Sequence, residues 1–471
     1  MMNTTQKATT SNLNTITASF RDPSGFVFLH DNTVYRQINH VYARHYDHLI
    51  ESGLYDRLVT ARLLVAHSEA ESALTQTDAA YRVIQPEPVE TIAYPYEWCF
   101  SQLQDAALAT LEIQRIALKH GMILKDASAY NIQFVGGRPV LIDTLSFEIY
   151  QDGQVWDAYR QFCQHFLAPL VLMSYKDIRL AALSQLYIDG VPLDLAISLL
   201  PKRSWLKLGV VLHLHLHNRA QRRNAGKNVQ QKMRPISRQS LHNIIDNLES
   251  TIRSLRWNPE HTAWADYYQG DSYDDVGLDH KKEIVVRYIE QANPRNVWDL
   301  GANTGVFSRL CSQRGIPTVA WDVDPGAVEL NYREVKRSKE ANLLPLIADL
   351  TNPSPGIGWA NQEREAFAER GGVDLVLALA LIHHLAIGNN VSLAGVAHFM
   401  STLTEYLIIE FVPKEDIKVQ TLLASRRDIF PDYTREGFES AFETVFTIIE
   451  AHDVENSLRR LYLMRKKRTD A

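Results

Sequence analysis

The sequence predicts an α/β protein: a doubly wound, mostly parallel sheet closed by an antiparallel hairpin, preceded by a smaller α+β domain. From Asn296 onward, short apolar runs alternate with helical stretches, which is typical of a doubly wound sheet. The last two runs, FTIIEAHDV and RLYLMRK, are separated by a short polar turn and therefore predict a terminal antiparallel hairpin. The N-terminal half instead combines a few short strands with long helical stretches, as expected of an α+β domain.

Length and composition suit a protein of two or three domains. The 471 residues are 45% apolar and carry a formal net charge of -6, so large cores are available and no global cationic field attracts nucleic acid. Cys99, Cys163 and Cys311 are too scattered for a disulfide framework, and we expect a cytoplasmic location. Because no run reaches the roughly 18–20 apolar residues of a membrane span, we expect no membrane partner.

The pattern divides the chain into four segments. Residues 1–20 form a flexible polar tail, 21–212 the α+β domain, 213–250 a basic linker with a helix, and 251–471 the doubly wound domain. Within the second segment, residues 25–38 predict a hairpin around Asp31-Asn32, and residues 101–120 predict a helix.

The linker has a distinctive charge. Between His213 and Ser240 there is no acidic residue, but there are seven basic ones: Arg219, Arg222, Arg223, Lys227, Lys232, Arg234 and Arg238. A phosphate-rich partner such as RNA would suit this segment. We favour a solvated connector between the domains and keep RNA binding as an alternative.

A glycine-containing turn follows the first strand of the doubly wound domain. The run VWDLGANTG (297–305) ends a strand and opens a helix, and open α/β sheets bind ligands at this edge. Gly301 and Gly305 allow the backbone to approach a ligand closely. Asp299 would repel a pyrophosphate, whereas the ammonium and sulfonium of S-adenosylmethionine favour nearby anionic groups. The turn, which includes Asn303, therefore points away from a dinucleotide and toward S-adenosylmethionine.

The next two strands also end in carboxylates. Asp322 ends the second strand, where it could accept both ribose hydroxyls of an adenosine. Asp349 ends the third strand, where it could take the adenine amino group. We therefore expect these carboxylates to line the same ligand site.

With these motifs in order, residues from about 260 to 471 resemble class I S-adenosylmethionine-dependent methyltransferases. The resemblance implies a Rossmann-like, seven-stranded methyltransferase sheet that transfers a methyl group from S-adenosylmethionine. It also implies that the methionine end contacts the first turn, the ribose Asp322 and the adenine Asp349. The candidate cofactor-binding residues are Asp299, Gly301, Asn303, Gly305, Asp322, Asp349 and Leu379.

The candidate catalytic residues follow the fourth and fifth strands. His383 and His384 lie where the family has substrate-facing residues, and either could be a general base because imidazole titrates near neutrality. Packing at the strand end is the alternative, since methyl transfer needs chiefly alignment. Glu410 faces the same edge and either binds substrate or pairs with Lys414. We expect no metal in this domain.

The N-terminal domain carries a second motif. In LKDASAYNIQF and LIDTLSFE, Asp126 and Asn131 are followed by Asp143, which resembles the catalytic loop and metal-binding strand of kinases and small-molecule phosphotransferases. No lysine lies between Lys7 and Lys119, so the ATP-anchoring lysine has no candidate except an imperfect arginine substitute. We expect a degenerate kinase-like fold in which Asp126, Asn131 and Asp143 are vestigial.

The whole chain, through these phrases and EFVPKEDIKVQ, also resembles bacterial nodulation host-specificity methyltransferases. We therefore expect a methyltransferase whose N-terminal domain selects substrate or partner. One alternative is a bifunctional protein that keeps ATP- and magnesium-dependent phosphotransfer or nucleotide binding. Another is an RNA-binding methyltransferase that uses the linker. The acceptor (a small molecule, a sugar, RNA or protein) and the oligomeric state remain open.

Overall fold

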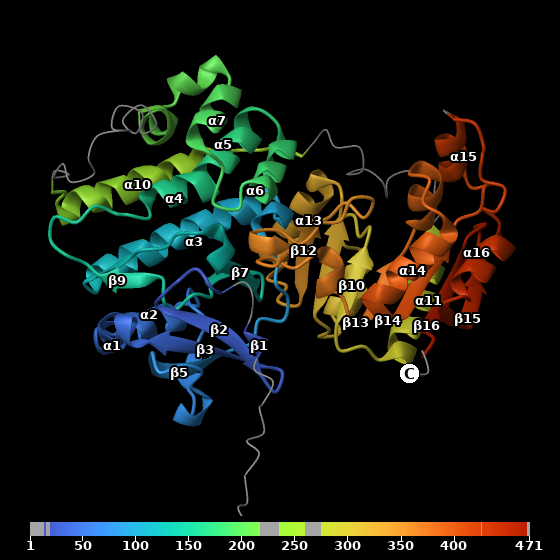
Figure 1. The fold of residues 1–471 in the computed structure, drawn as a ribbon. Coiled ribbons are helices and arrows are strands. Elements are labelled where there is room, and N and C mark those ends of the chain that lie inside the picture. The colour runs from blue at the N-terminus through green and yellow to red at the C-terminus, as the bar shows by residue number, and fades with distance from the viewer. Residues whose placement is uncertain (1–13, 16–18, 217–234, 260–274, 425, 469–471) are drawn as a thin grey trace, which may run out of the picture.

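The protein consists of two halves packed side by side (Figure 1), with the N-terminal half in blue to green and the C-terminal sheet in yellow to red. The computed structural model describes residues 14–15, 19–216, 235–259, 275–424 and 426–468. Within these residues no helix is both long enough and apolar enough to cross a bilayer.

The N-terminal half begins with an antiparallel sheet of order β1-β2-β3-β5-β4. The predicted hairpin is confirmed, because Asp31 and Asn32 form its turn with φ of 48° and 60°. The strands are β1 (Asn14–Thr15), β2 (Gly25–His30), β3 (Thr33–Asn39), β4 (His67–Glu69) and β5 (Ala80–Pro86). Two helices, α1 (Ala43–Glu51) and α2 (Leu54–Thr60), join β3 to β4.

A helical region follows, built around α3 (Phe100–Lys119), which confirms the helix predicted for residues 101–120. Two small hairpin-like sheets lie beside it, β6 (Met122–Leu124) with β9 (Phe147–Ile149), and β7 (Ile132–Val135) with β8 (Arg138–Leu141). The remaining helices are α4 (Tyr159–Phe162), α5 (Ala168–Tyr175), α6 (Leu183–Leu186), α7 (Leu193–Leu199), α8 (Leu208–Val210) and α10 (Arg238–Ser254). Helix α10 packs against α3 and α8, so it lies with the N-terminal half.

The C-terminal half is a seven-stranded sheet of order β12-β11-β10-β13-β14-β16-β15. Its first five strands are parallel, and β16 is antiparallel to both neighbours, which confirms the doubly wound sheet and terminal hairpin. The strands are β10 (Val297–Leu300), β11 (Thr318–Asp322), β12 (Leu343–Ile347), β13 (Val373–Ala378), β14 (Thr404–Phe411), β15 (Phe446–Asp453) and β16 (Arg460–Lys466). Strand order reverses between β10 and β13, where sheets of this kind bind ligands.

Helices cover this sheet and set the direction of its turns. They are α11 (Asp275–Ala292), α12 (Ser308–Ser312), α13 (Pro325–Ser338), α14 (Leu393–Leu403), α15 (Ile417–Ala424) and α16 (Arg435–Phe442). The chain turns sharply into α13 because Asp324 caps its first turn through the Gly326 N–H, with Pro325 at the first helical position. Helix α12 begins only at Ser308, since turn conformation continues to Phe307.

The two halves meet along the β12 edge of the sheet. The Ser101 backbone N–H and Oγ, at the start of α3, donate to the carboxylate of Glu329 on α13 at 2.9 and 2.5 Å. The Gln102 side chain donates to the carbonyl of Pro345 on β12 at 2.9 Å. The N-terminal half therefore covers an edge strand that would otherwise expose unpaired backbone groups.

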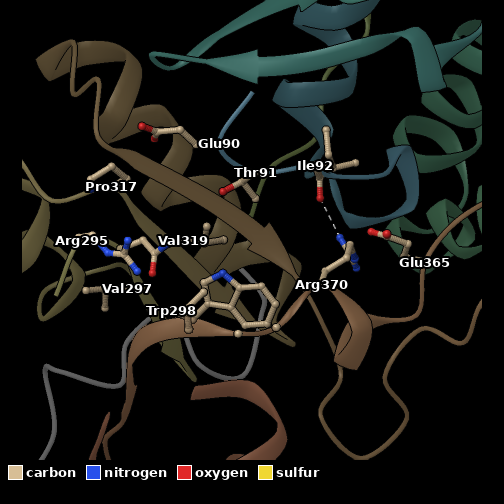
Figure 2. A pocket seen from close by; sticks show the side chains of 14 residues that line it. Glu90, Thr91, Ile92, Arg295, Val297, Trp298, Pro317, Val319, Glu365 and Arg370 are labelled. Carbon is tan, nitrogen blue, oxygen red and sulfur yellow. Dashed lines mark hydrogen bonds between the residues drawn. The ribbon is translucent and has the colours of Figure 1, made fainter. Parts of the chain in front are cut away.

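A second contact lies near the amino ends of the strands. Arg370 donates to the Glu97 carboxylate and, at 2.9 Å, to the carbonyl of Ile92 (Figure 2). Beside it, residues 90–92 and the beginnings of β10, β11 and β13 enclose a cavity of about 550 Å³. This cavity opens at the sheet edge opposite the predicted cofactor site.

Candidate active site

A cavity of about 350 Å³ lies at the carboxyl edge of the sheet, where β10, β11, β12 and β13 end. It brings together seven of the residues that the sequence singles out: Asp299, Gly301, Asn303, Asp322, Asp349, Leu379 and His384. Gly305, His383 and Glu410 are not among its lining residues. The strand ends thus converge as expected, while three candidate side chains have other surroundings.

Asp299 is the most deeply buried carboxylate of the cavity, with 1% of its surface exposed. It accepts a hydrogen bond of 2.6 Å from the Ser308 hydroxyl at the start of α12. Burial raises the pKa of Asp299 to about 7, and the Ser308 hydrogen bond and the Lys281 charge only partly oppose this rise. A cationic ligand beside Asp299 would relieve the cost of its buried charge.

Asp322 joins the turn after β10 to the turn after β11. Its carboxylate accepts the backbone N–H of Asn303 at 2.7 Å and that of Asp324 at 2.8 Å. Burial raises the pKa of Asp322 to about 6, against the lowering effect of these backbone hydrogen bonds. The carboxylate end of β11 is therefore fixed against the β10 turn, at the cavity wall.

The β10 turn depends on left-handed backbone conformations. Gly301, Asn303 and Gly305 have φ of 78°, 51° and 82°. Gly301 lines the cavity, but a Cβ on Gly305 would lie 2.5 Å from the side-chain nitrogen of Asn331. Gly305 does not line the cavity, and its close approach is to α13, while its contact with a ligand stays a prediction.

Asp349 differs from the other two carboxylates because it is exposed. It accepts the Thr351 backbone N–H at 2.8 Å and the Thr351 hydroxyl at 2.6 Å, which fixes it at the cavity rim. Such a rim carboxylate keeps acceptor capacity for a ligand amino group.

The histidine pair lies after β13, with ring centroids 4.1 Å apart. His384 lines the cavity, whereas His383 is 0% exposed and neither of its ring nitrogens has a hydrogen-bond partner among the described residues. Burial, with help from Arg459 and Lys418, lowers the pKa of His384 to about 4. Burial also holds the pKa of His383 well below its usual value. Both rings are therefore neutral at neutral pH. We expected imidazoles that titrate near neutrality, but burial lowers both pKa values below that range.

Glu410 is 0% exposed and forms an ion pair of 2.8 Å with Lys281 on α11. The same oxygen accepts the backbone N–H of Ala380 at 2.7 Å. The suggested pairing with Lys414 is wrong, because Lys414 binds Asp428 at 2.7 Å. Ala380, which lines the cavity, has φ of 49°, so Glu410 anchors a strained turn rather than facing the cavity.

Sequence reasoning missed Arg459, in the loop between β15 and β16. Arg459 is 0% exposed, lines the cavity, and binds Asp416 at 2.7 Å. No local pattern marks it, since its partners come from a distant loop. Lys281 on α11 also lines the cavity. Trp264 and Tyr273, two aromatic residues that precede Lys281 in the sequence, lie outside the described residues.

The kinase-like residues also come together, in the N-terminal half. The Ser146 hydroxyl donates to Asp143 at 2.5 Å and lies 3.4 Å from the Asn131 side-chain nitrogen, which donates to it. Arg36 on β3 forms a 2.7 Å ion pair with Asp143. Burial and the nearby Asp143 raise the pKa of Asp126. An arginine therefore holds the carboxylate that would bind magnesium in a kinase.

The basic linker and possible metal sites can be assessed only within the described residues. Of the seven basic linker residues, only Arg238 is described, 3.9 Å from Asp152. Within the described ranges, no group of three or more His, Cys, Asp or Glu side chains could hold a metal ion.

Comparison with known proteins gives a whole-chain relative. Nodulation protein NoeA of Rhizobium meliloti (strain 1021) is 37% identical over 460 residues, covering 95% of both chains. Ribosomal protein L11 methyltransferases of Rhizobium johnstonii and Chelativorans are 29% identical over 126 residues, or 24% of this chain and 40% of theirs.

Solved structures match only part of the chain. WbdD, described as a bifunctional kinase-methyltransferase, is 16% identical over 42% of each chain, with a TM-score of 0.31. Magnesium protoporphyrin IX methyltransferase of Synechocystis PCC 6803 is 16% identical over 43% of this chain and 92% of its own, also at 0.31. No protein-family model matches. Through its whole-length relative, the chain belongs to the family of nodulation protein NoeA, and it is an S-adenosylmethionine-dependent methyltransferase.

Proposed function

We propose that the cavity at the carboxyl edge binds S-adenosylmethionine, with its methionine ammonium near Asp299, its ribose at Asp322 and its adenine at Asp349. The single observation that carries this assignment is that the carboxylates from three neighbouring strand ends line one cavity. The residues fit the cofactor, because Asp299 is a buried carboxylate whose charge needs a cationic partner. Gly301, Asn303 and Leu379 complete the wall.

The acceptor enters beside His384, the one histidine of the pair that lines the cavity. When bound, the cofactor supplies an electrophilic methyl group. With its pKa lowered to about 4, His384 is neutral and a weak base, so it orients an acceptor or accepts a hydrogen bond from it. The acceptor itself is a small molecule, a sugar, RNA or a protein.

Glu410 acts as a positioning residue. Its hydrogen bond to the Ala380 N–H holds the left-handed turn that carries Leu379 and Leu381 along the cavity wall. Glu410→Gln should weaken cofactor binding, and Ala380→Gly should restore part of that loss because glycine adopts the turn without strain. No rescue by glycine would show that Glu410 acts by another route.

The N-terminal domain, residues 21–212, serves substrate or partner selection rather than phosphotransfer. The supporting observation is the Arg36–Asp143 ion pair, since the guanidinium occupies the carboxylate that magnesium would need. The alternative, a bifunctional protein with ATP- and magnesium-dependent activity, requires this pair to open. The sequence predicts that the methyltransferase domain begins at residue 251, but this boundary falls within α10, which packs with the N-terminal half. We therefore place the domain after α10, at residues 255–471, and its action in the cytoplasm.

Calorimetric titration of the intact protein with S-adenosylmethionine tests the assignment. Asp299→Ala and Asp322→Asn should each weaken binding by at least about tenfold, the loss of a hydrogen bond to a charged group. Asp374→Asn is the matched control, because Asp374 lies on β13 at the opposite edge, paired with Arg295 at 2.8 Å. Unchanged binding in both cavity variants would contradict the proposal.

Identifying the acceptor needs a comparison of cells. Metabolites, tRNA and proteins from a deletion strain and its parent can be compared by mass spectrometry. The acceptor is the species that lacks one methyl group in the deletion strain and regains it when the purified enzyme and cofactor are added. Restoration by the Asp299→Ala variant would count against the assigned cofactor site.

A further inference from the structure

A surface of large apolar side chains lies in the helical part of the N-terminal half, remote in sequence from the cofactor cavity. Leu206 and Leu208 are 85% and 78% exposed, and Trp205 is 54% exposed. Leu212 and Leu216 are 43% and 46% exposed. We call these five residues the apolar surface. Large apolar residues that are exposed singly are ordinary, but a contiguous group of them marks an interaction site.

The apolar surface belongs to a well-anchored helical segment. It runs from η7 (Lys202–Leu206) through α8 into the π-helix η8 (Val211–Leu216), beside α7 and α10 (Figure 1). The opposite side of the segment is buried, with Val210 and Leu214 at 1% and 0% exposure. Leu208, Leu212 and Leu216 follow each other at four-residue spacing and share the outer side. The helix is therefore apolar on both sides, and the core explains only one of them.

Polar contacts fix the inner side in place. His213 lies between the Tyr159 hydroxyl, at 2.7 Å, and the side-chain oxygen of Asn247, at 2.8 Å. The ring of His215 stacks on Trp205 with centroids 3.8 Å apart. This stack joins η7 to η8, so Trp205 is held against the helix that carries Leu212 and Leu216.

The charged residues within the segment that carries the apolar surface are basic. Lys202, Arg203 and Lys207 are exposed and alternate with its residues. Between Lys202 and Leu216 the segment has no acidic residue. A partner for this face is therefore both anionic and able to bury leucine side chains.

We propose that this face docks the protein peripherally on an anionic lipid surface. Leucine and tryptophan side chains gain by entering the boundary between headgroups and acyl chains, while lysine and arginine pair with anionic headgroups. RNA offers the charge but no apolar phase for exposed leucines, so it satisfies only half of the surface. The docking is independent of the proposed cofactor roles. It revises the expectation of no membrane partner, which rested on the absence of a spanning segment.

Sedimentation of the intact protein with vesicles tests the proposal. We expect binding to phosphatidylcholine vesicles that contain phosphatidylglycerol, at least about tenfold weaker binding to phosphatidylcholine alone, and loss of binding in high salt. Equal binding to both vesicle types, or binding to neither, would overturn the proposal without any variant.

Two variants separate the apolar and the charged contributions. Leu206→Glu with Leu208→Glu should reduce vesicle binding at least about tenfold, and so should alanine at Lys202, Arg203 and Lys207. Leu458→Glu is the matched control, because Leu458 is a 64% exposed leucine in the β15–β16 loop. Unchanged S-adenosylmethionine affinity shows that each variant is folded.

The other occupants of this face have their own signatures. Binding of an RNA oligonucleotide by a protein that ignores anionic vesicles would replace the lipid with a nucleic acid. A concentration-dependent dimer that Leu206→Glu converts to monomer, again without vesicle binding, would replace it with a second copy of the chain. Either outcome refutes lipid docking.

Discussion

Replacing Asp299 by asparagine should make the cofactor-free protein more stable at alkaline pH and should lower its affinity for S-adenosylmethionine. The folded protein raises the pKa of Asp299 to about 7, compared with about 3.9 in an unfolded chain. The carboxyl is neutral in both states below pH of about 4 and therefore costs nothing there. The penalty grows as the pH rises and is complete above pH of about 7.

The size of the effect follows from the shift. Three pKa units correspond to about 4 kcal/mol of folding free energy, an upper bound for the burial of this charge. Asparagine removes the charge and keeps an oxygen for the Ser308 hydroxyl, but its amide N–H groups need acceptors that the site has to supply. We expect a net gain of about 1–3 kcal/mol at pH of about 8, or about 2–4 °C in melting temperature per kcal/mol for a domain of this size.

Thermal melts of the cofactor-free protein across acidic to alkaline pH measure the effect. The gain of Asp299→Asn should shrink toward zero as the pH falls to about 4. Asp374→Asn is the control of opposite sign, because the Arg295 side chain lowers the pKa of Asp374 and makes its charge stabilising. An Asp299→Asn protein that melts lower than wild type by the same amount at every pH would refute the burial argument.

Three further predictions concern the cofactor, the interface and the kinase-like site. S-adenosylmethionine affinity in the wild type should fall as the pH drops below about 7, where Asp299 and then Asp322 gain a proton, as measured by titration calorimetry at several pH values. Arg370→Ala should cost about 3–5 kcal/mol because it strands the buried Glu97, and adding Glu97→Gln should recover part of the loss in thermal melts. Magnesium-ATP should leave the melting temperature of the intact protein unchanged. Arg36→Ala should lower the free energy of unfolding by about 1–3 kcal/mol, and the melting temperature with it, because Asp143 loses its partner. A clear rise in melting temperature with magnesium-ATP would instead support the bifunctional alternative.

Local signals predicted the framework of the sheet. Alternating strands and helices set the parallel order, and the short polar turn after Asp453 set the terminal hairpin. Asp299, Asp322 and Asp349 could be assigned to one edge because the carboxyl ends of parallel strands always meet there. These features depend only on sequence neighbours and on general rules of topology.

Contacts between segments that are distant in the sequence could not be predicted from it. Glu410 looked free to pair with Lys414, four residues away, but α11 brings Lys281 to it from 129 residues away. Arg459 reaches the cavity from a loop with no motif of its own. The lowered pKa values of the two histidines arise from burial, which a sequence shows only indirectly. The substrate side was therefore harder to predict than the cofactor side.

The interface explains how the N-terminal half stays attached to the C-terminal sheet. Glu97 and Glu329 are 2% and 0% exposed, and each carboxylate finds donors on the other half of the protein. Separating the halves would remove the Arg370 donors from Glu97 and the Ser101 donors from Glu329, and each carboxylate would keep only donors from its own half. Losing donors to a buried carboxylate is costly. The Gln102 contact adds cover for the β12 edge strand, whose carboxyl end carries Asp349. The N-terminal half therefore supports the β12 side of the cavity, where we propose that adenosine binds, and this structural role does not require any phosphotransfer chemistry at Asp126, Asn131 and Asp143.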